Sequence, residues 1–307
     1  MEQIIKFKSI DEYNKVYGVE TLHPLVHAID TSNIMCEEIP EMSIAYSFDF
    51  YSIFLFEMDN SVDYGKIKYG RNFYDYQDGT LMFTAPGQIM QNIPSLNIEN
   101  CPGGWSLMFH PDLLRGTQLG RNVKNYSFFS YEVNEALHLS SQERKMILEC
   151  FKNIEYELHR GMDNHTKDLI ISNIELFLNY CKRFYERQFI TRAWVNSDIL
   201  SRFEKVLDDY FRSDMPQKLG LPTVKYCADK LNLSVNYLSD MLRRDTGKST
   251  LEHIQLHLIE TAKEKMFEKD KSVSQIAYEL GFEYPQYFSR LFKKCVGMSP
   301  NEFRSMN

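Results

Sequence analysis

The side chains best suited to recognising another molecule lie in two short segments about fifty residues apart. In the later segment, Gln286 can bind adenine and Arg290 can bind guanine, each through two hydrogen bonds. In the earlier segment, Asn236 can bind adenine and Asp240 can accept a hydrogen bond from cytosine. The alternative to base recognition is that each of these residues only lies on a solvated helix face. The full set of candidates for base-edge contacts is Asn236, Ser239, Asp240, Pro285, Gln286 and Arg290.

Basic residues accompany both segments and could bind phosphate groups. They are Arg243, Arg244 and Lys248 in the first segment, and Arg290, Lys293 and Lys294 in the second. Residues 197–307 hold 17 Lys and Arg against 16 Asp and Glu, while the whole chain has a net charge of −7. The excess acid therefore lies in residues 1–196. A balance this close to zero predicts only modest non-specific attraction to nucleic acid.

Each segment is the second half of a repeated pattern of short helix, tight turn and second helix. Ala228 and Ala277 lie in the first helices, where a small side chain lets the second helix cross closely. Gly247 and Gly297 are expected to end the second helices. The matched apolar positions are Val224 and Val273, Leu231 and Leu280, Leu233 and Phe282, Leu238 and Phe288, and Leu242 and Phe292.

A long helix is expected between the two patterns. Ser249 and Glu252 form a capping-box sequence, and the helix should continue to about residue 268. Its roughly 18 residues would span about 27 Å, near the distance of about 34 Å between neighbouring major-groove segments. Residues 197–307 are thus expected to form an all-α domain with two helix pairs joined by a rigid spacer.

The second copy also carries a signature of fixed spacing. Its members are Val273, Ile276-Ala277, Gly281-Phe282, Tyr287-Phe288, Phe292-Lys293-Lys294, Gly297, Ser299-Pro300 and Phe303-Arg304. The signature resembles the AraC/XylS family of bacterial transcription regulators. The resemblance implies two helix-turn-helix units that bind a double-stranded DNA operator, and a contact with RNA polymerase. Asp240 departs from the Arg or Lys often found at its place in the family, which implies weaker binding by the first unit.

Residues 42 to about 110 alternate between apolar and polar side chains in short runs separated by turn residues, a pattern typical of a small β-barrel or sandwich. The run from Asp78-Gly79 to Pro86-Gly87 resembles a hairpin of the cupin-like sensor domain of the same regulators. The resemblance implies a sensor domain over residues 1–139. The fold class expected for the whole chain is therefore α+β with several domains.

Two amphipathic helices are expected over residues 140–187, the first opened by a capping-box pattern at Ser140 and Glu143. In the family such helices commonly pair two subunits, which implies a homodimer. The alternative is that they only cover an open edge of the barrel. Residues 188–196 are expected to form the linker to the second domain.

A small-molecule effector is expected in the barrel, because aromatic side chains with one polar group often line such sites. The candidates are Tyr74, Phe83, Trp105 and His110. Ordinary core packing is the alternative role for each. A barrel that binds a protein partner, or that only dimerises, is the alternative function.

Other classes of function fit the sequence poorly. A cupin-type metalloenzyme would need a histidine cluster, but residues 42–109 contain no histidine. The pairs His23/His27 and His253/His257 have a spacing that can hold zinc but no evident third ligand, so neither a metal nor a cofactor is expected. The six cysteines are scattered, which is typical of reduced cytoplasmic thiols. The beginning of the sequence lacks the pattern of a signal peptide, and no apolar run is long enough to span a bilayer.

Overall fold

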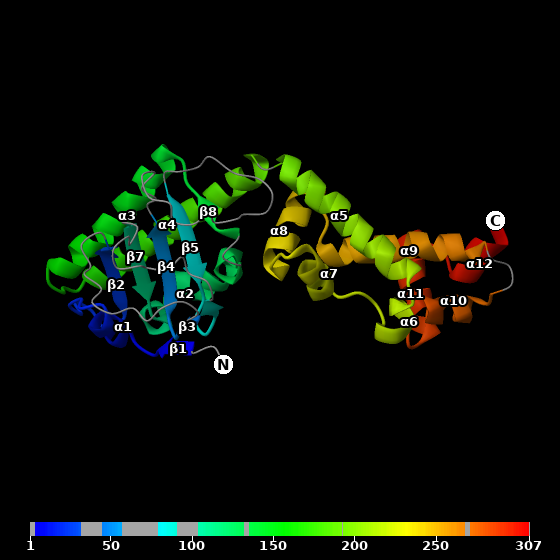
Figure 1. The fold of residues 1–307 in the computed structure, drawn as a ribbon, viewed down its shortest axis with the longest axis horizontal. Coiled ribbons are helices and arrows are strands. Elements are labelled where there is room, and N and C mark those ends of the chain that lie inside the picture. Colours follow the sequence, from blue (N-terminus) through cyan, green and yellow to red (C-terminus); the bar gives the residue numbers. More distant parts are fainter. Residues whose placement is uncertain are drawn as a thin grey trace. The chain divides into compact units, whose positions relative to one another are not determined.

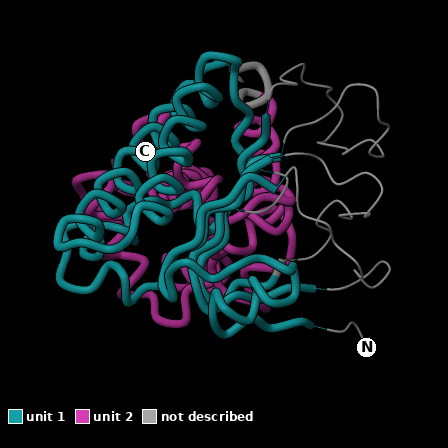
Figure 2. The backbone as a smooth tube through the Cα atoms, turned by 90° about the vertical axis from the view of Figure 1, so that its left-hand side faces the viewer, with its two compact units in different colours: residues 1–191 teal, residues 192–307 magenta. Residues whose placement is uncertain are grey.

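A computed structural model describes residues 4–31, 45–56, 79–90, 104–131, 135–191, 193–267 and 271–306 (Figure 1). The chain divides into two compact units, residues 1–191 and residues 192–307 (Figure 2). Tyr74 lies outside the described residues, as do residues 57–78 of the region expected to form strands. No helix in the described parts is long and apolar enough to cross a membrane.

Two β-sheets form the centre of the first unit. The larger sheet is antiparallel and has the order β2-β7-β4-β5-β8; the smaller has the order β1-β3-β6. Their strands are β1 (Ile4–Phe7), β2 (Val26–Asp30), β3 (Ala45–Phe48), β4 (Tyr51–Phe56), β5 (Thr80–Thr84), β6 (Ile89–Met90), β7 (Gly104–Phe109) and β8 (Leu137–His138). The described strands stay in two separate sheets, so the structure confirms a sheet region but not a closed cupin-like barrel.

The two sheets share a hydrophobic core. Phe7 of β1 stacks on Phe48 of β3 with 5.6 Å between ring centroids. Met82 of β5 and Met108 of β7 belong to the same buried cluster. Helix α1 (Ile10–Val16) adds Ile10, which is fully buried. Side chains alternate between the two faces of a strand. Met108 of β7 therefore points toward the smaller sheet, and the residues on either side of it point to the other face of the larger sheet.

Helices α3 (Ser141–His159) and α4 (Thr166–Thr191) contribute the side chains that meet the other face of the larger sheet. Trp105 of β7 packs against Phe151 of α3 at 5.5 Å, and Phe151 packs against Phe177 of α4 at 5.3 Å. The expected capping box of Ser140 and Glu143 is present. Short helical turns follow β7: η2 (Pro111–Leu114), α2 (Gln118–Asn122), η3 (Val123–Asn125) and η4 (Ser127–Ser130).

The segment expected as a linker, residues 188–196, is largely helical. Helix α4 continues to Thr191, and α5 begins at Ala193. Gln188 explains the extension, because its buried amide accepts a hydrogen bond from the backbone N–H of His138 at 2.8 Å and donates to the carbonyl of Ala136 at 3.1 Å. These bonds fix the last turns of α4 to β8, so this part of the chain belongs to the first unit.

The second unit is entirely helical in its described part, as expected. Its helices are α5 (Ala193–Arg212), α6 (Met215–Leu219), α7 (Val224–Leu231), α8 (Val235–Thr246), α9 (Thr250–Met266), α10 (Val273–Glu279), α11 (Pro285–Val296) and α12 (Pro300–Met306). Both small residues at the expected crossings, Ala228 of α7 and Ala277 of α10, are fully buried. The turns after α7 and α10 each contain one residue with positive φ, Asn232 at 55° and Gly281 at 93°.

Buried His27 of β2 makes the stability of the first unit depend on pH. Burial lowers the pKa of His27 to about 4, from about 6.5 in an unfolded chain. Because the folded-state pKa is the lower one, the stabilising contribution of the neutral ring is complete above about pH 6.5 and is lost as the pH falls toward 4. Lowering the pH from 7 to 5 should therefore reduce the free energy of unfolding by about 2 kcal/mol, measured by urea unfolding.

His27→Gln provides the control for this prediction. The amide can keep the hydrogen bond that the ring Nε2 shares with Ser106 Oγ at 3.0 Å, but it does not titrate. The variant should lose most of the difference in unfolding free energy between pH 7 and pH 5. An unchanged pH dependence in the variant would assign the effect to other groups.

Candidate nucleic-acid interface

Helix α11 has a buried face and an opposite polar face. Phe288 and Phe292 are fully buried, and Phe292 packs against Phe303 of α12 at 5.6 Å. At 3.6 residues per turn, Gln286 and Arg290 project from the side opposite these rings, and both are exposed. Lys293 and Lys294, in the last turn of α11, are also exposed. One side of this helix therefore presents an amide, a guanidinium and two ammonium groups to solvent.

Helix α8 has the same construction. Leu238 and Leu242 are fully buried, while Asn236, Asp240 and Arg243 lie on the opposite side. Arg243 is exposed; Asn236 and Asp240 are half-buried. Ser234 begins the helix by accepting a hydrogen bond from the N–H of Tyr237 at 3.1 Å, and Gly247 ends it with φ of 74°. Arg244 lies in the last turn of the helix and is half-buried, and Lys248 lies just after the helix and is exposed.

The two helices differ in charge at matched places. Aligning Leu238 with Phe288 and Leu242 with Phe292 places Asp240 where α11 has Arg290. The face of α8 therefore carries a carboxylate at the position where α11 carries a guanidinium. A carboxylate repels DNA phosphates, whereas a guanidinium attracts them.

Two of the sequence candidates serve the protein's own structure. The hydroxyl of Ser239 donates to the carbonyl of Val235 at 2.7 Å and accepts from the hydroxyl of Thr250, at the start of α9, at 3.2 Å. Pro285 is the first residue of α11. A backbone N–H at this position would have no hydrogen-bond partner within the helix, so proline is tolerated there. Ser239 therefore contributes to the contact between α8 and α9, and Pro285 to the start of α11.

Helix α9 connects the two helix pairs as a continuous rod. Its 17 residues span about 26 Å at 1.5 Å per residue. The expected capping box is present, and hydrogen bonds from the backbone and hydroxyl of Ser249 lower the pKa of Glu252. Leu258 and Ala262 are buried in the core that α9 shares with α10 and α11. This packing makes α9 a part of the core as well as a spacer.

Known proteins with similar sequences share this region. A sequence profile of a helix-turn-helix domain matches residues 227–306. The transcriptional regulatory protein YesN of Bacillus subtilis is 38% identical over 92 residues, which are 28% of this chain and 25% of that protein. The arabinose operon regulatory protein of Escherichia coli is 36% identical over 78 residues, which are 25% of this chain and 27% of that protein. This part of the chain is therefore similar to a helix-turn-helix domain and to regulatory proteins of transcription.

The chain spans only about a quarter of the length of each of these two relatives. Among solved structures, the C-terminal domain of AraT, a response regulator from Geobacillus stearothermophilus, is similar with a TM-score of 0.31 and 28% identity, over 36% of this chain and 85% of that chain. The residues that match the helix-turn-helix profile lie in the second unit of the chain.

Two tyrosines that were not among the candidate site residues lie beside the polar face of α11. Tyr284 is 48% exposed and Tyr287 is 54% exposed, and their rings meet edge to face at 5.9 Å. The AraC/XylS signature includes an aromatic residue at position 287, but the signature alone does not say whether this side chain faces the core or the solvent. The helical period could have shown it, because Tyr287 lies a quarter turn away from buried Phe288.

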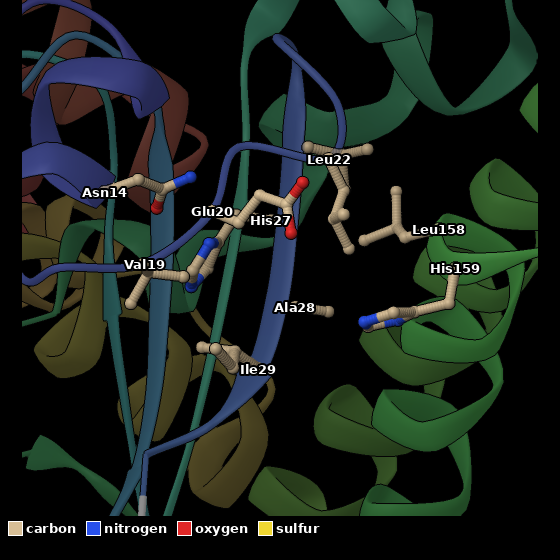
Figure 3. Close-up of a pocket in the computed structure, with 10 residues that line it drawn as sticks. Asn14, Val19, Glu20, Leu22, His27, Ala28, Ile29, Leu158 and His159 are labelled. Atoms are coloured by element: carbon tan, nitrogen blue, oxygen red, sulfur yellow. The ribbon is translucent and has the colours of Figure 1, made fainter. Parts of the chain in front are cut away.

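The three described candidates for an effector pocket, Phe83, Trp105 and His110, each have contacts of their own. Phe83 packs against Phe128 at 4.6 Å, and Trp105 packs against Phe151 on another part of the same sheet face. His110 caps η2 by accepting a hydrogen bond from the N–H of Asp112 at 3.2 Å. The cavity between α1, β2 and α3 has other lining residues (Figure 3). Phe83 and Trp105 have the surroundings of core residues, and His110 those of a helix cap.

Metal-binding groups are scattered through the described residues, where no cluster of three or more His, Cys, Asp or Glu could hold an ion. His257 instead lies 3.2 Å from Asp208, and His253 shares a hydrogen bond of 2.7 Å with Thr246. Cys150, Cys181, Cys227 and Cys295 are free thiols. The two histidines of α9 therefore have contacts within the second unit.

Proposed function

We propose that the protein binds a specific DNA operator and regulates transcription, with α8 and α11 as the recognition helices of two helix-turn-helix units. The observation that carries the proposal is the polar face of α11, where Gln286, Arg290 and Lys293 project opposite two buried phenylalanines. Gln and Arg can read base edges, and Lys can bind the phosphates beside them. α8 would enter the neighbouring major-groove segment, with α9 setting the distance.

A footprint tests the two-helix arrangement. Operators can be selected from random-sequence DNA with the full-length protein and then mapped by hydroxyl-radical cleavage. We expect two protected patches per subunit, about ten base pairs apart on one face of the duplex, because neighbouring major-groove segments repeat at that distance. A single short patch would mean that only one helix reads DNA.

The first unit is proposed to dimerise and to control DNA binding. On α4, Leu169, Leu176 and Ile190 are 44%, 45% and 61% exposed, and they repeat at multiples of seven residues. Such a repeat of exposed apolar residues is typical of a helix that packs on a parallel or antiparallel partner helix. We propose a homodimer in which this stripe of α4 contacts a second copy, with an effector or a protein partner as the signal and RNA polymerase as the target.

Sedimentation tests the dimer. Leu176→Lys adds a charge to the middle of the stripe without disturbing the core, so it should convert a dimer to a monomer at micromolar protein. Leu219→Lys is the matched control, because Leu219 is 66% exposed in the second unit. A wild-type chain that sediments as a monomer would contradict the proposal, as would a Leu176→Lys variant that stays dimeric.

A further inference from the structure

Two exposed tyrosines at the start of α11 occupy the places of two structural residues at the start of α8. In the alignment of the two helices, Tyr284 matches Ser234 and Tyr287 matches Tyr237. Ser234 caps α8 by accepting a hydrogen bond from a backbone N–H, whereas Tyr284 begins α11 without a side-chain cap. Tyr237 is buried, whereas Tyr284 and Tyr287 are exposed. The two tyrosines of α11 therefore do not take over the capping and packing roles of their counterparts.

This choice of residues weakens the start of α11. A side chain that does not accept a backbone hydrogen bond is a poor helix cap, and an exposed ring leaves apolar surface in water. The rings of Tyr284 and Tyr287 meet edge to face at 5.9 Å, a favourable arrangement for two aromatic side chains. Positions where a sequence breaks a local structural rule without a gain in packing are expected at functional sites. The pair is therefore a candidate for contact with a bound molecule.

Tyr287 lies beside the groups that are proposed to read DNA. At 3.6 residues per turn, its side chain projects about 60° around the helix from Arg290 and about 100° from Gln286. Lys294, about two turns further along, projects in nearly the same direction as Tyr287 and is exposed. The positive charges of Arg290 and Lys294 attract phosphates, and the first turn of a recognition helix is the part that reaches base edges. A DNA duplex bound to α11 would therefore lie against the ring of Tyr287.

The apolar ring of Tyr287 fits one feature of the major groove. The base edges there carry hydrogen-bond donors and acceptors, which lose water without compensation when an apolar ring covers them. The C5 methyl group of thymine is the one apolar group that the four standard bases present in this groove. Contact between the methyl group and the ring removes apolar surface from water on both sides. Thymine is therefore the base that fits Tyr287 best.

We propose that Tyr287 recognises a thymine of the operator by packing its ring against the C5 methyl group, and that Tyr284 holds this ring in position. The thymine lies next to the bases that Gln286 and Arg290 read. This inference rests on the proposed DNA-binding function and adds a third base to the site read by α11. Hydrogen bonds then recognise two of the bases, and apolar contact recognises the third.

Uracil tests the proposal, because it is thymine without the C5 methyl group and forms the same base pair with adenine. Each thymine of the selected operator is replaced in turn by deoxyuridine, and binding of the full-length chain is measured by fluorescence anisotropy. One replacement, beside the position at which Arg290→Ala relaxes the base preference, should weaken binding about fourfold, as expected for the loss of one buried methyl group.

Three variants show whether Tyr287 makes this contact. Tyr287→Ala should bind the thymine and uracil operators with equal affinity, whereas Tyr287→Phe should keep the fourfold preference because it keeps the ring. Tyr284→Ser restores the residue type that caps α8, so it should raise the urea midpoint for unfolding of the second unit but lower the preference for thymine. Tyr278→Ala is the control and should keep the full preference, because Tyr278 is 53% exposed on another helix, α10.

The preference for thymine over uracil separates this role from any other role of the ring. The proposal is overturned if no uracil replacement weakens binding of the wild-type chain, if the operator has no thymine beside the position read by Arg290, or if Tyr287→Ala keeps the preference. An unchanged preference in Tyr284→Ser would overturn the positioning role of Tyr284.

The same experiment distinguishes failure of this inference from failure of the proposed function. A chain that selects no operator at all would refute DNA recognition itself, whereas an operator whose binding depends on Arg290 supports that function whatever Tyr287 does. The comparison of thymine with uracil needs no variant, so a variant that does not fold leaves the comparison intact.

Discussion

Arg290→Ala and Gln286→Ala are each expected to weaken binding to the selected operator about 5- to 150-fold, which corresponds to the loss of one base contact. Both side chains are exposed on the polar face of α11, so their removal leaves the core of Phe288 and Phe292 intact. Electrophoretic mobility shifts against the operator and against mutated operators would measure the loss. The preference for one base should also relax at a different position for each variant.

Asp240→Ala is expected to behave in the opposite way. The carboxylate of Asp240 lies at the place on α8 that matches Arg290, where it repels phosphates. Its removal should leave the operator affinity unchanged or raise it.

Arg202→Ala is the control for Arg290→Ala, because it also removes one positive charge and Arg202 lies on α5, where it is about half exposed. Equal losses for Arg202→Ala and Arg290→Ala would mean that only overall charge matters, and relaxed preference at a cytosine in Asp240→Ala would mean that Asp240 reads that base.

Gly281→Ala should reduce the free energy of unfolding of the second unit by about 2–5 kcal/mol. Gly281 has φ of 93°, which an alanine adopts only with strain. A Cβ atom there would also lie 2.8 Å from both the carbonyl oxygen of Pro216 and the carbonyl carbon of Gly220. Both contacts are backbone atoms, so no flexible side chain can move aside. Urea unfolding followed by circular dichroism would measure the change.

Gly297→Ala separates the strain from the collision. Gly297 has a similar φ of 87°, but nothing lies within 4 Å of its added Cβ, so only the backbone strain of about 1 kcal/mol remains. Asn232→Gly, at the matched turn after α7, should be neutral or slightly stabilising, because glycine relieves the strain at φ of 55°. The account is wrong if Gly281→Ala costs no more than Gly297→Ala.

The helices of the second unit could be predicted because their signals are local. The capping boxes of Ser249 with Glu252 and of Ser272 with Gln275 are formed within a few residues, and both appear in the structure. The end of α4 could not be predicted in the same way. Gln188 keeps that helix ordered through bonds to residues about fifty positions earlier, and no local pattern contains such a partner.

The same distinction between local and distant contacts explains why the sequence predicted the strands of the first unit but not how they pair. Strand character was readable from alternation, but the pairing of β1 with β3 or of β2 with β7 depends on contacts distant in sequence. Aromatic residues suggested a pocket at Phe83 and Trp105, yet aromatic side chains more often fill a core than line a ligand site. The burial of the polar residue Asn14 in a short helix is likewise revealed only by the tertiary structure.

The unequal faces of α8 and α11 would distinguish the two halves of a bound site. If α8 and α11 occupy neighbouring groove segments, two equal readers could exchange half-sites when the subunit shifts by one groove along the DNA. A carboxylate at position 240 and a guanidinium at position 290 would make the shifted complex weaker than the correct one. The difference between these two matched positions would thus fix the register of the subunit on its site.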